Sequence, residues 1–85
     1  MTYEIIFSDN ALTQLKKLEH SIQERIIKSL ERIRIRPEAY ITKLVGDPGY
    51  RLRVGDYRVI MDIDKETLHF LIIKIGHRRN IYQKI

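Results

Sequence analysis

The apolar positions divide the chain into a first half with helical spacing and a second half with strand-like alternation. The run TYEIIF at residues 2–7 is apolar and rich in strand-forming residues, so it predicts a first strand. Ser8 follows as a helix N-cap, and Asp9 suits the first turn. Beyond it, one apolar face of a short helix is formed by Leu12, Leu15 and Leu18.

A second helix is predicted after the polar break HSIQER. Ser21 and Glu24 have the spacing of a capping box, which favours a helix start at that point. The apolar stripe that follows comprises Ile22, Ile26, Ile27, Leu30 and Ile33, and the other face carries Arg25, Lys28, Glu31 and Arg32. Pro37 ends the helix, because the residue before a proline avoids helical angles. Two helices with so short a break predict an antiparallel helical hairpin.

The remainder predicts a loop at 38–49 and then three strands. YRLRV at 50–54 alternates, a Gly-Asp hairpin turn follows, and YRVIMDI continues at 57–63. After the turn DKET, the run LHFLIIKI is apolar on both faces, as in a central strand. The order β-α-α-β-β-β predicts one α+β domain over residues 1–85, with a helical hairpin packed on one face of a mostly antiparallel sheet.

Charge is concentrated in the second half. The 85 residues carry a net charge of +5. Residues 1–42 hold seven Lys/Arg and six Asp/Glu, whereas residues 43–85 hold nine and five. This excess fits a nucleic-acid ligand, but it equally fits an acidic partner protein or simple solubility.

The sequence lacks the motifs that are typical of several function classes. The chain has no cysteine, so a disulfide framework and a thiolate zinc site are excluded. Metal-ligand spacing, a phosphate-binding glycine loop and a nucleophile elbow are also missing. The first residues do not resemble a signal peptide, and apolar runs such as FLII are too short to span a bilayer. We therefore expect a cytoplasmic protein with no cofactor, no metal and no membrane partner.

Three arginines in the most regular strands need an explanation. Arg51 and Arg53 share one face of their strand, and a tight Gly-Asp turn brings Arg58 close to them. Beyond Gly76 the chain turns and presents the HRR segment at 77–79, so we expect the cations and an imidazole to share one concavity. Asp62 is a candidate partner, but one carboxylate does not neutralise the set.

Two interpretations remain open for these arginines. They either solvate one face of a half-exposed sheet, or they form a phosphate clamp, for which the planar guanidinium fork is well suited. Tyr82 is a packing residue, a platform on which a base stacks, or a proton donor. His77 is a surface residue at a strand end or a proton-transfer group near neutral pH.

The segments YRLRVGDYRV and GHRRNIY closely resemble the RelE/ParE superfamily of toxins, and the resemblance covers the whole chain. It implies the same α+β fold. RelE-like members are endoribonucleases that cut mRNA in the ribosomal A site by attack of its own 2′-hydroxyl, without a metal. ParE-like members share the fold but inhibit DNA gyrase. Both are silenced by a cognate antitoxin, which wraps around the toxin.

The resemblance also implies roles for individual residues. Arg51 and Arg53 match two strand positions that are lysines in the best-known member. Arg58 matches the arginine thought to stabilise the transition state. Arg78 matches the cation after the last strand, and Tyr82 matches the tyrosine that stacks on the mRNA base.

The arginines at 51 and 53 are a departure from that pattern, because arginine does not release its proton at usable pH. His77, Tyr82, or the substrate and ribosome must then supply proton transfer. Lys43 and Arg79 are assigned to RNA binding. The leading hypothesis is a ribosome-dependent mRNA endonuclease toxin whose partners are an antitoxin and ribosome-bound mRNA. The alternatives are a gyrase inhibitor and an inactive antitoxin-binding module.

Overall fold

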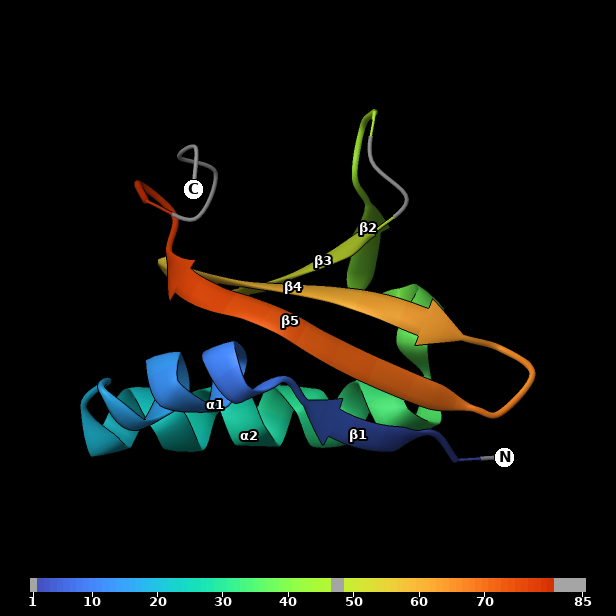
Figure 1. Ribbon diagram of the computed structural model, residues 1–85, viewed down its shortest axis with the longest axis horizontal. Coiled ribbons are helices and arrows are strands. Elements are labelled where there is room, and N and C mark those ends of the chain that lie inside the picture. Colours follow the sequence, from blue (N-terminus) through green and yellow to red (C-terminus); the bar gives the residue numbers. More distant parts are fainter. Residues whose placement is uncertain (1, 47–48, 81–85) are drawn as a thin grey trace.

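The computed structural model describes residues 2–46 and 49–80, and the side chain of Glu38 lies outside this description. Strand β1 (Glu4–Phe7) precedes helices α1 (Asp9–Lys16) and α2 (His20–Ile35) and a short 3-10 turn (Pro37–Ala39). Four strands follow: β2 (Ile41–Lys43), β3 (Tyr50–Val54), β4 (Tyr57–Asp64) and β5 (His69–His77). Figure 1 shows both helices on the same side of the sheet.

The sheet has the order β1-β5-β4-β3-β2, in which only the β1–β5 pair is parallel. The α+β architecture, the single sheet face covered by helices and the central position of β5 are therefore confirmed. Within the described ranges, no helix combines the length and the apolar character needed to cross a membrane.

Strand β2 lies in the segment predicted as a loop, so that part of the prediction is wrong. Its three residues pair antiparallel with β3, and Ile41 is opposite Leu52. Ile41 packs against the core, which explains why an isolated apolar residue is sufficient to add an edge strand. A strand this short gives no visible alternation in the sequence.

The core lies between the helices and the sheet. Ala11 and Leu15 of α1 meet Ile26, Leu30 and Ile33 of α2, and all five are buried. The sheet contributes Leu52, Val54, Val59, Met61, Phe70, Ile72 and Ile75. Two members of the predicted stripes, Leu12 and Ile27, are instead exposed by 37% and 40%.

The two helix starts differ in how they are capped. Ser8 caps α1 as predicted, because its hydroxyl accepts the Ala11 N–H at 3.0 Å. The predicted capping box at Ser21 is wrong: α2 starts at His20, with Glu19 in the N-cap position and no side-chain cap bond. Glu24 lies 3.2 Å from His20 Nδ1 instead.

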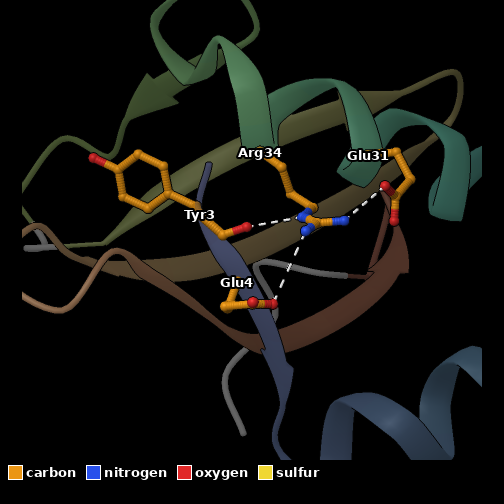
Figure 2. A network of polar contacts seen from close by, with 4 residues as sticks. All are labelled: Tyr3, Glu4, Glu31 and Arg34. Atoms are coloured by element: carbon orange, nitrogen blue, oxygen red, sulfur yellow. Dashed lines mark hydrogen bonds and ion pairs between the residues drawn. The ribbon is translucent and has the colours of Figure 1, made fainter. Parts of the chain in front are cut away.

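Arg34 ties the end of α2 to β1 (Figure 2). Its Nε donates to the Tyr3 carbonyl at 2.8 Å, and Nη1 donates to Glu31 at 2.9 Å. Nη2 lies 4.0 Å from the Glu4 carboxylate. The Tyr3 N–H donates back to the Arg34 carbonyl at 3.0 Å, so both backbones take part in the link.

The β4–β5 turn is organised by Asp64. Its Oδ1 accepts the N–H groups of Glu66 and Thr67 at 3.0 and 3.2 Å. Hydrogen bonding from Thr67 lowers the pKa of the Asp64 carboxyl group, because those bonds favour the charged form. Leu68 closes the turn in the left-handed region with φ 59°.

Helix α1 completes the edge of β5 where β1 ends. β1 pairs with β5 as far as Ile72. Beyond that point the Ser8 hydroxyl donates to the Ile73 carbonyl at 3.1 Å, and Gln14 Oε1 accepts the Ile75 N–H at 2.7 Å. Two side chains of one helix thus satisfy backbone groups that a strand would otherwise pair.

We predict that Gln14→Ala lowers the free energy of unfolding by about 1–3 kcal/mol, since the half-buried Ile75 N–H loses its acceptor. Gln14→Glu keeps an acceptor oxygen and serves as the control. Urea unfolding of both variants measures the difference. Equal stability of Gln14→Ala and the wild type would contradict the role of this bond.

Candidate functional site

The β3–β4 hairpin sets two arginines directly opposite each other. Val54 pairs with Tyr57 across a two-residue turn, and the next pair is Arg53 with Arg58. Gly55 has φ 59°, which suits the first central position of such a turn. Because Leu52, Val54 and Val59 are buried on the helix side, strand alternation directs both arginines to the open side of the sheet.

A second row of the sheet adds Arg51 and Lys74. Arg51 is opposite Ile60, and Ile60 is opposite Lys74 on β5. Arg58 is opposite Gly76, so β5 contributes no side chain next to Arg58 in this row. Arg51, Arg53, Arg58 and Lys74 therefore share one face, and we call this set the clamp.

Lys74 was not identified from the sequence. Strict alternation from Phe70 and Ile72 would direct Lys74 into the core. A bulge intervenes, however: Ile60 pairs with Lys74 and Met61 pairs with Ile72, so β5 contains an extra residue there. The bulge is visible only in the structure, where the buried positions of β5 step by two and then by three to Ile75.

Backbone carbonyls hold Arg58 in place. Its Nη1 donates to the carbonyl groups of Gly55 and Tyr57, both at 2.9 Å, and its side chain is half-buried. Among the residues that the structure describes, no carboxylate forms an ion pair with Arg53 or Arg58. Asp62 does not fill that role; it lies further along β4 and lines a cavity with Ile6.

The chain after β5 returns to the β3–β4 turn. The Arg78 N–H donates to the Asp56 carbonyl at 2.7 Å, and its Nε lies 3.8 Å from the Asp56 carboxylate. Arg78 is thus brought to the end of the sheet that carries Arg58, as expected. Arg79 is exposed, and its N–H donates to His77 Nδ1 at 3.2 Å.

His77 does not share the face of the clamp. It pairs with Tyr57, and the two rings meet edge to face with centroids 5.5 Å apart. Since the neighbouring pair is Arg58 with Gly76, alternation directs the imidazole to the helix side of the sheet. The three strand arginines therefore share one face of the sheet, as expected, whereas the His77 ring lies on the other face.

Two further candidates lie elsewhere. Lys43 on β2 is opposite Tyr50, which alternates with Arg51, so its register also directs it away from the clamp. It lines a cavity of about 270 Å³ with Tyr3 and Pro37. Tyr82 lies outside the described residues. Across the described ranges, no group of three or more His, Cys, Asp or Glu side chains is arranged to hold a metal.

The family model for the ParE toxin of type II toxin–antitoxin systems matches residues 5–82. The chain belongs to this family. The Escherichia coli mRNA interferase toxin RelE is 28% identical over 81 residues, which cover 92% of this chain and 85% of that relative. The protein is a RelE-like toxin of the RelE/ParE superfamily.

Solved structures of related toxins have the same fold. The toxin from the RelE–RelB complex of Pyrococcus horikoshii is 26% identical with a TM-score of 0.79, over 94% of this chain and 99% of that one. A chain of the Escherichia coli RelBE complex is 30% identical with a TM-score of 0.75, over 88% of this chain and 95% of that one. A chain of the RelBE2 complex of Mycobacterium tuberculosis has a TM-score of 0.84, over 92% of this chain and 100% of that one. At 23% identity, it supports the fold alone.

The facing arginines predict a measurable cost in stability. Like charges directly opposite each other across two strands repel, so Arg53→Gln should raise the free energy of unfolding by a few tenths of a kcal/mol at low salt. The gain should vanish as salt screens the repulsion. Lys16→Gln, on the exposed end of α1, is the control. A salt-independent loss of stability in Arg53→Gln would show that Arg53 supports the fold.

Proposed function

We propose that this toxin is a ribosome-dependent endoribonuclease that cuts mRNA in the ribosomal A site. The observation that carries the proposal is the pair of facing arginines without a carboxylate partner among the described residues. A sheet that only solvates its open face would more usually mix the two signs of charge. Uncompensated guanidinium groups held in a fixed geometry suit a phosphate that arrives with its own negative charge.

The proposed reaction needs positioning and charge stabilisation more than covalent participation by the protein. The 2′-hydroxyl gives its proton to a base as its oxygen attacks the adjacent phosphorus. The bond from phosphorus to the 5′-oxygen breaks, and an acid gives a proton to that leaving oxygen. The products are a 2′,3′-cyclic phosphate and a 5′-hydroxyl. The clamp would orient the phosphate and stabilise the negative charge of the pentacovalent transition state. Arg58 is the central group, because the turn carbonyls already fix its side chain.

Proton transfer is the part that arginines do not supply. His77, which directly follows Gly76, the register partner of Arg58, is the candidate. Because its ring lies on the helix side of the sheet, it would reach the phosphate around the end of β5. Its Nδ1 accepts the Arg79 N–H, so the proton of the neutral ring lies on Nε2. We assign base stacking to Tyr82, and phosphate contacts of the bound RNA to Arg78, Arg79 and Lys43.

An antitoxin is the second proposed partner. The relatives from Pyrococcus horikoshii and Escherichia coli were solved in complexes with RelB. A net charge of +5 favours an antitoxin segment that carries acidic residues and covers apolar surface on the helices or a sheet edge. With these two partners, the proposed site of action is the cytoplasm.

Gyrase inhibition is the competing function, because the matching family model bears the name of ParE and the resemblance to ParE-like toxins implies that activity. Primer extension on translating mRNA after induction distinguishes the two. Cuts in phase with codons support the nuclease. Supercoiling changes without RNA cleavage would refute it.

We predict that Arg58→Ala lowers single-turnover cleavage on ribosomes by at least about 10²-fold, since one preorganised donor to the transition state is lost. The melting temperature and antitoxin affinity should change little. Lys74→Gln removes a charge from the same face without touching the turn, and should cause a smaller loss. A collapse of the Arg58→Ala melting temperature together with its activity would make Arg58 a structural residue.

We predict that His77→Gln lowers single-turnover cleavage by about 10²–10⁴-fold at saturating ribosomes, with binding little changed. Tyr57→Leu is the control, because it removes the ring contact but keeps the imidazole. Equal losses in both variants would indicate positioning rather than proton transfer. Full activity of His77→Gln beside an inactive Tyr82→Phe would assign the proton to Tyr82.

A further inference from the structure

A second group of cations lies on α2, beside the β3–β4 turn. A groove of about 250 Å³ is lined by Arg25, Lys28 and Arg32 of α2 together with Arg53 and Gly55 of the hairpin. We call it the α2 groove. No carboxylate lines it, and none of its four cations forms an ion pair within the part of the chain that the structure describes.

Three cations of α2 lie along one side of the helix. Arg25, Lys28 and Arg32 follow the spacing of three and four residues that aligns side chains along one face. Glu24 and Glu31 have the same spacing from Lys28, but both contact other residues. Glu24 contacts His20, whereas Glu31 accepts from Arg34 (Figure 2). The two carboxylates nearest to Lys28 along the helix therefore do not pair with it.

The β3–β4 turn joins the groove to the clamp. A Cβ atom on Gly55 would lie 2.8 Å from Nη2 of Arg25, so the guanidinium group of the helix packs directly on the turn. The Gly55 carbonyl accepts from Arg58 of the clamp. Arg53 belongs to both sets. It is the register partner of Arg58, and because the pairing of β2 with β3 ends at Leu52, it lies at an uncovered edge of the sheet, where it also lines the groove. A polyanion at the clamp has a continuous cationic path past the turn onto α2.

The lining of the groove favours nucleic acid over a protein partner. Protein interfaces have an apolar centre that is depleted of charge. Here the exposed lining is cationic, and its one large apolar member, Val54, is 6% exposed. Interfaces with nucleic acid are instead polar and strongly positive. From Arg25 to Arg32 the cations span about 10 Å of helix axis, which suits a chain of phosphates better than a single anion.

We propose that the α2 groove binds the phosphodiester backbone of RNA next to the strand held by the clamp. This inference rests on the proposed function in that both take RNA as the ligand, but it assigns no chemistry to the groove. The backbone comes either from the mRNA itself or from ribosomal RNA near the bound toxin. Its contribution is affinity without sequence preference, and it should weaken steeply with salt.

The test compares two triple variants with the same change in net charge. The groove variant is Arg25→Gln/Lys28→Gln/Arg32→Gln. The control is Lys16→Gln/Lys17→Gln/Lys65→Gln, whose exposed side chains lie outside the groove. Binding is measured by fluorescence anisotropy with a 2′-O-methyl RNA oligonucleotide over a range of salt. Attack by a 2′-hydroxyl is impossible in this probe, so the result does not depend on cleavage.

We expect the groove variant to weaken RNA binding at least tenfold at low salt. The slope of log Kd against log salt should fall by about two, as for three lost contacts to single-stranded phosphates. The control should change Kd less than threefold. Equal weakening in both variants would overturn the proposal, because net charge alone would then explain it. Circular dichroism shows whether the triple variants fold. The single variants Lys28→Gln and Arg32→Gln test the groove with a smaller change if the triple variant does not fold.

A second arm identifies the source of the RNA. A loss of affinity for the oligonucleotide assigns the groove to mRNA. A loss confined to empty ribosomes assigns it to ribosomal RNA. Unchanged binding to both RNA probes, beside weaker antitoxin association, would overturn the proposal in favour of a protein surface. If the wild type binds the oligonucleotide through the groove but never cuts ribosome-bound mRNA, the proposed function fails while the groove assignment stands.

Discussion

The extra residue in β5 is the constraint on which the site depends. By inserting Ile73, the bulge keeps Phe70, Ile72 and Ile75 in the core while Lys74 faces the arginines. The same bulge sets Gly76 opposite Arg58, so β5 adds no side chain next to that arginine. Bulges need support because they interrupt the ladder. Here α1 provides it through Ser8 and Gln14, which hydrogen bond the backbone of β5 where β1 has ended.

Arginines serve two purposes in this toxin, and their partners distinguish them. Arg34 has a carbonyl and two carboxylates around it and links α2 to β1 (Figure 2). Arg53 faces another arginine across the strands. The partners of Arg34 add to the stability of the fold, whereas the repulsion between Arg53 and Arg58 reduces it. A face that is costly in the free protein is consistent with a ligand that brings its own negative charge.

The sequence predicted those parts of the fold that have a strong period or a clear turn residue. The Gly55 turn and the alternation of Leu52 with Arg53 were enough to bring the arginines together. The sequence did not reveal β2, since three residues give no alternation. It also did not give the start of α2, because Ser21 and Glu24 have the spacing of a capping box whereas the N-cap is Glu19. The expected position of His77 was wrong because β5 continues to His77 instead of ending at Gly76. Lys74 was hidden because one inserted residue inverts every following side chain relative to the core. That insertion is stabilised by residues far away in the chain, so no local pattern announces it.

The structure separates the fixed cations from the one described residue beside them that can move a proton. The arginines of the clamp stand on paired strands, and their permanent charge makes them poor at moving protons. His77, which can move one, lies at the end of β5 on the other face of the sheet. The Arg78 N–H ties the chain after β5 to the Asp56 carbonyl of the β3–β4 turn. Under the proposed nuclease function, phosphate binding and proton transfer therefore depend on different segments that meet at this turn.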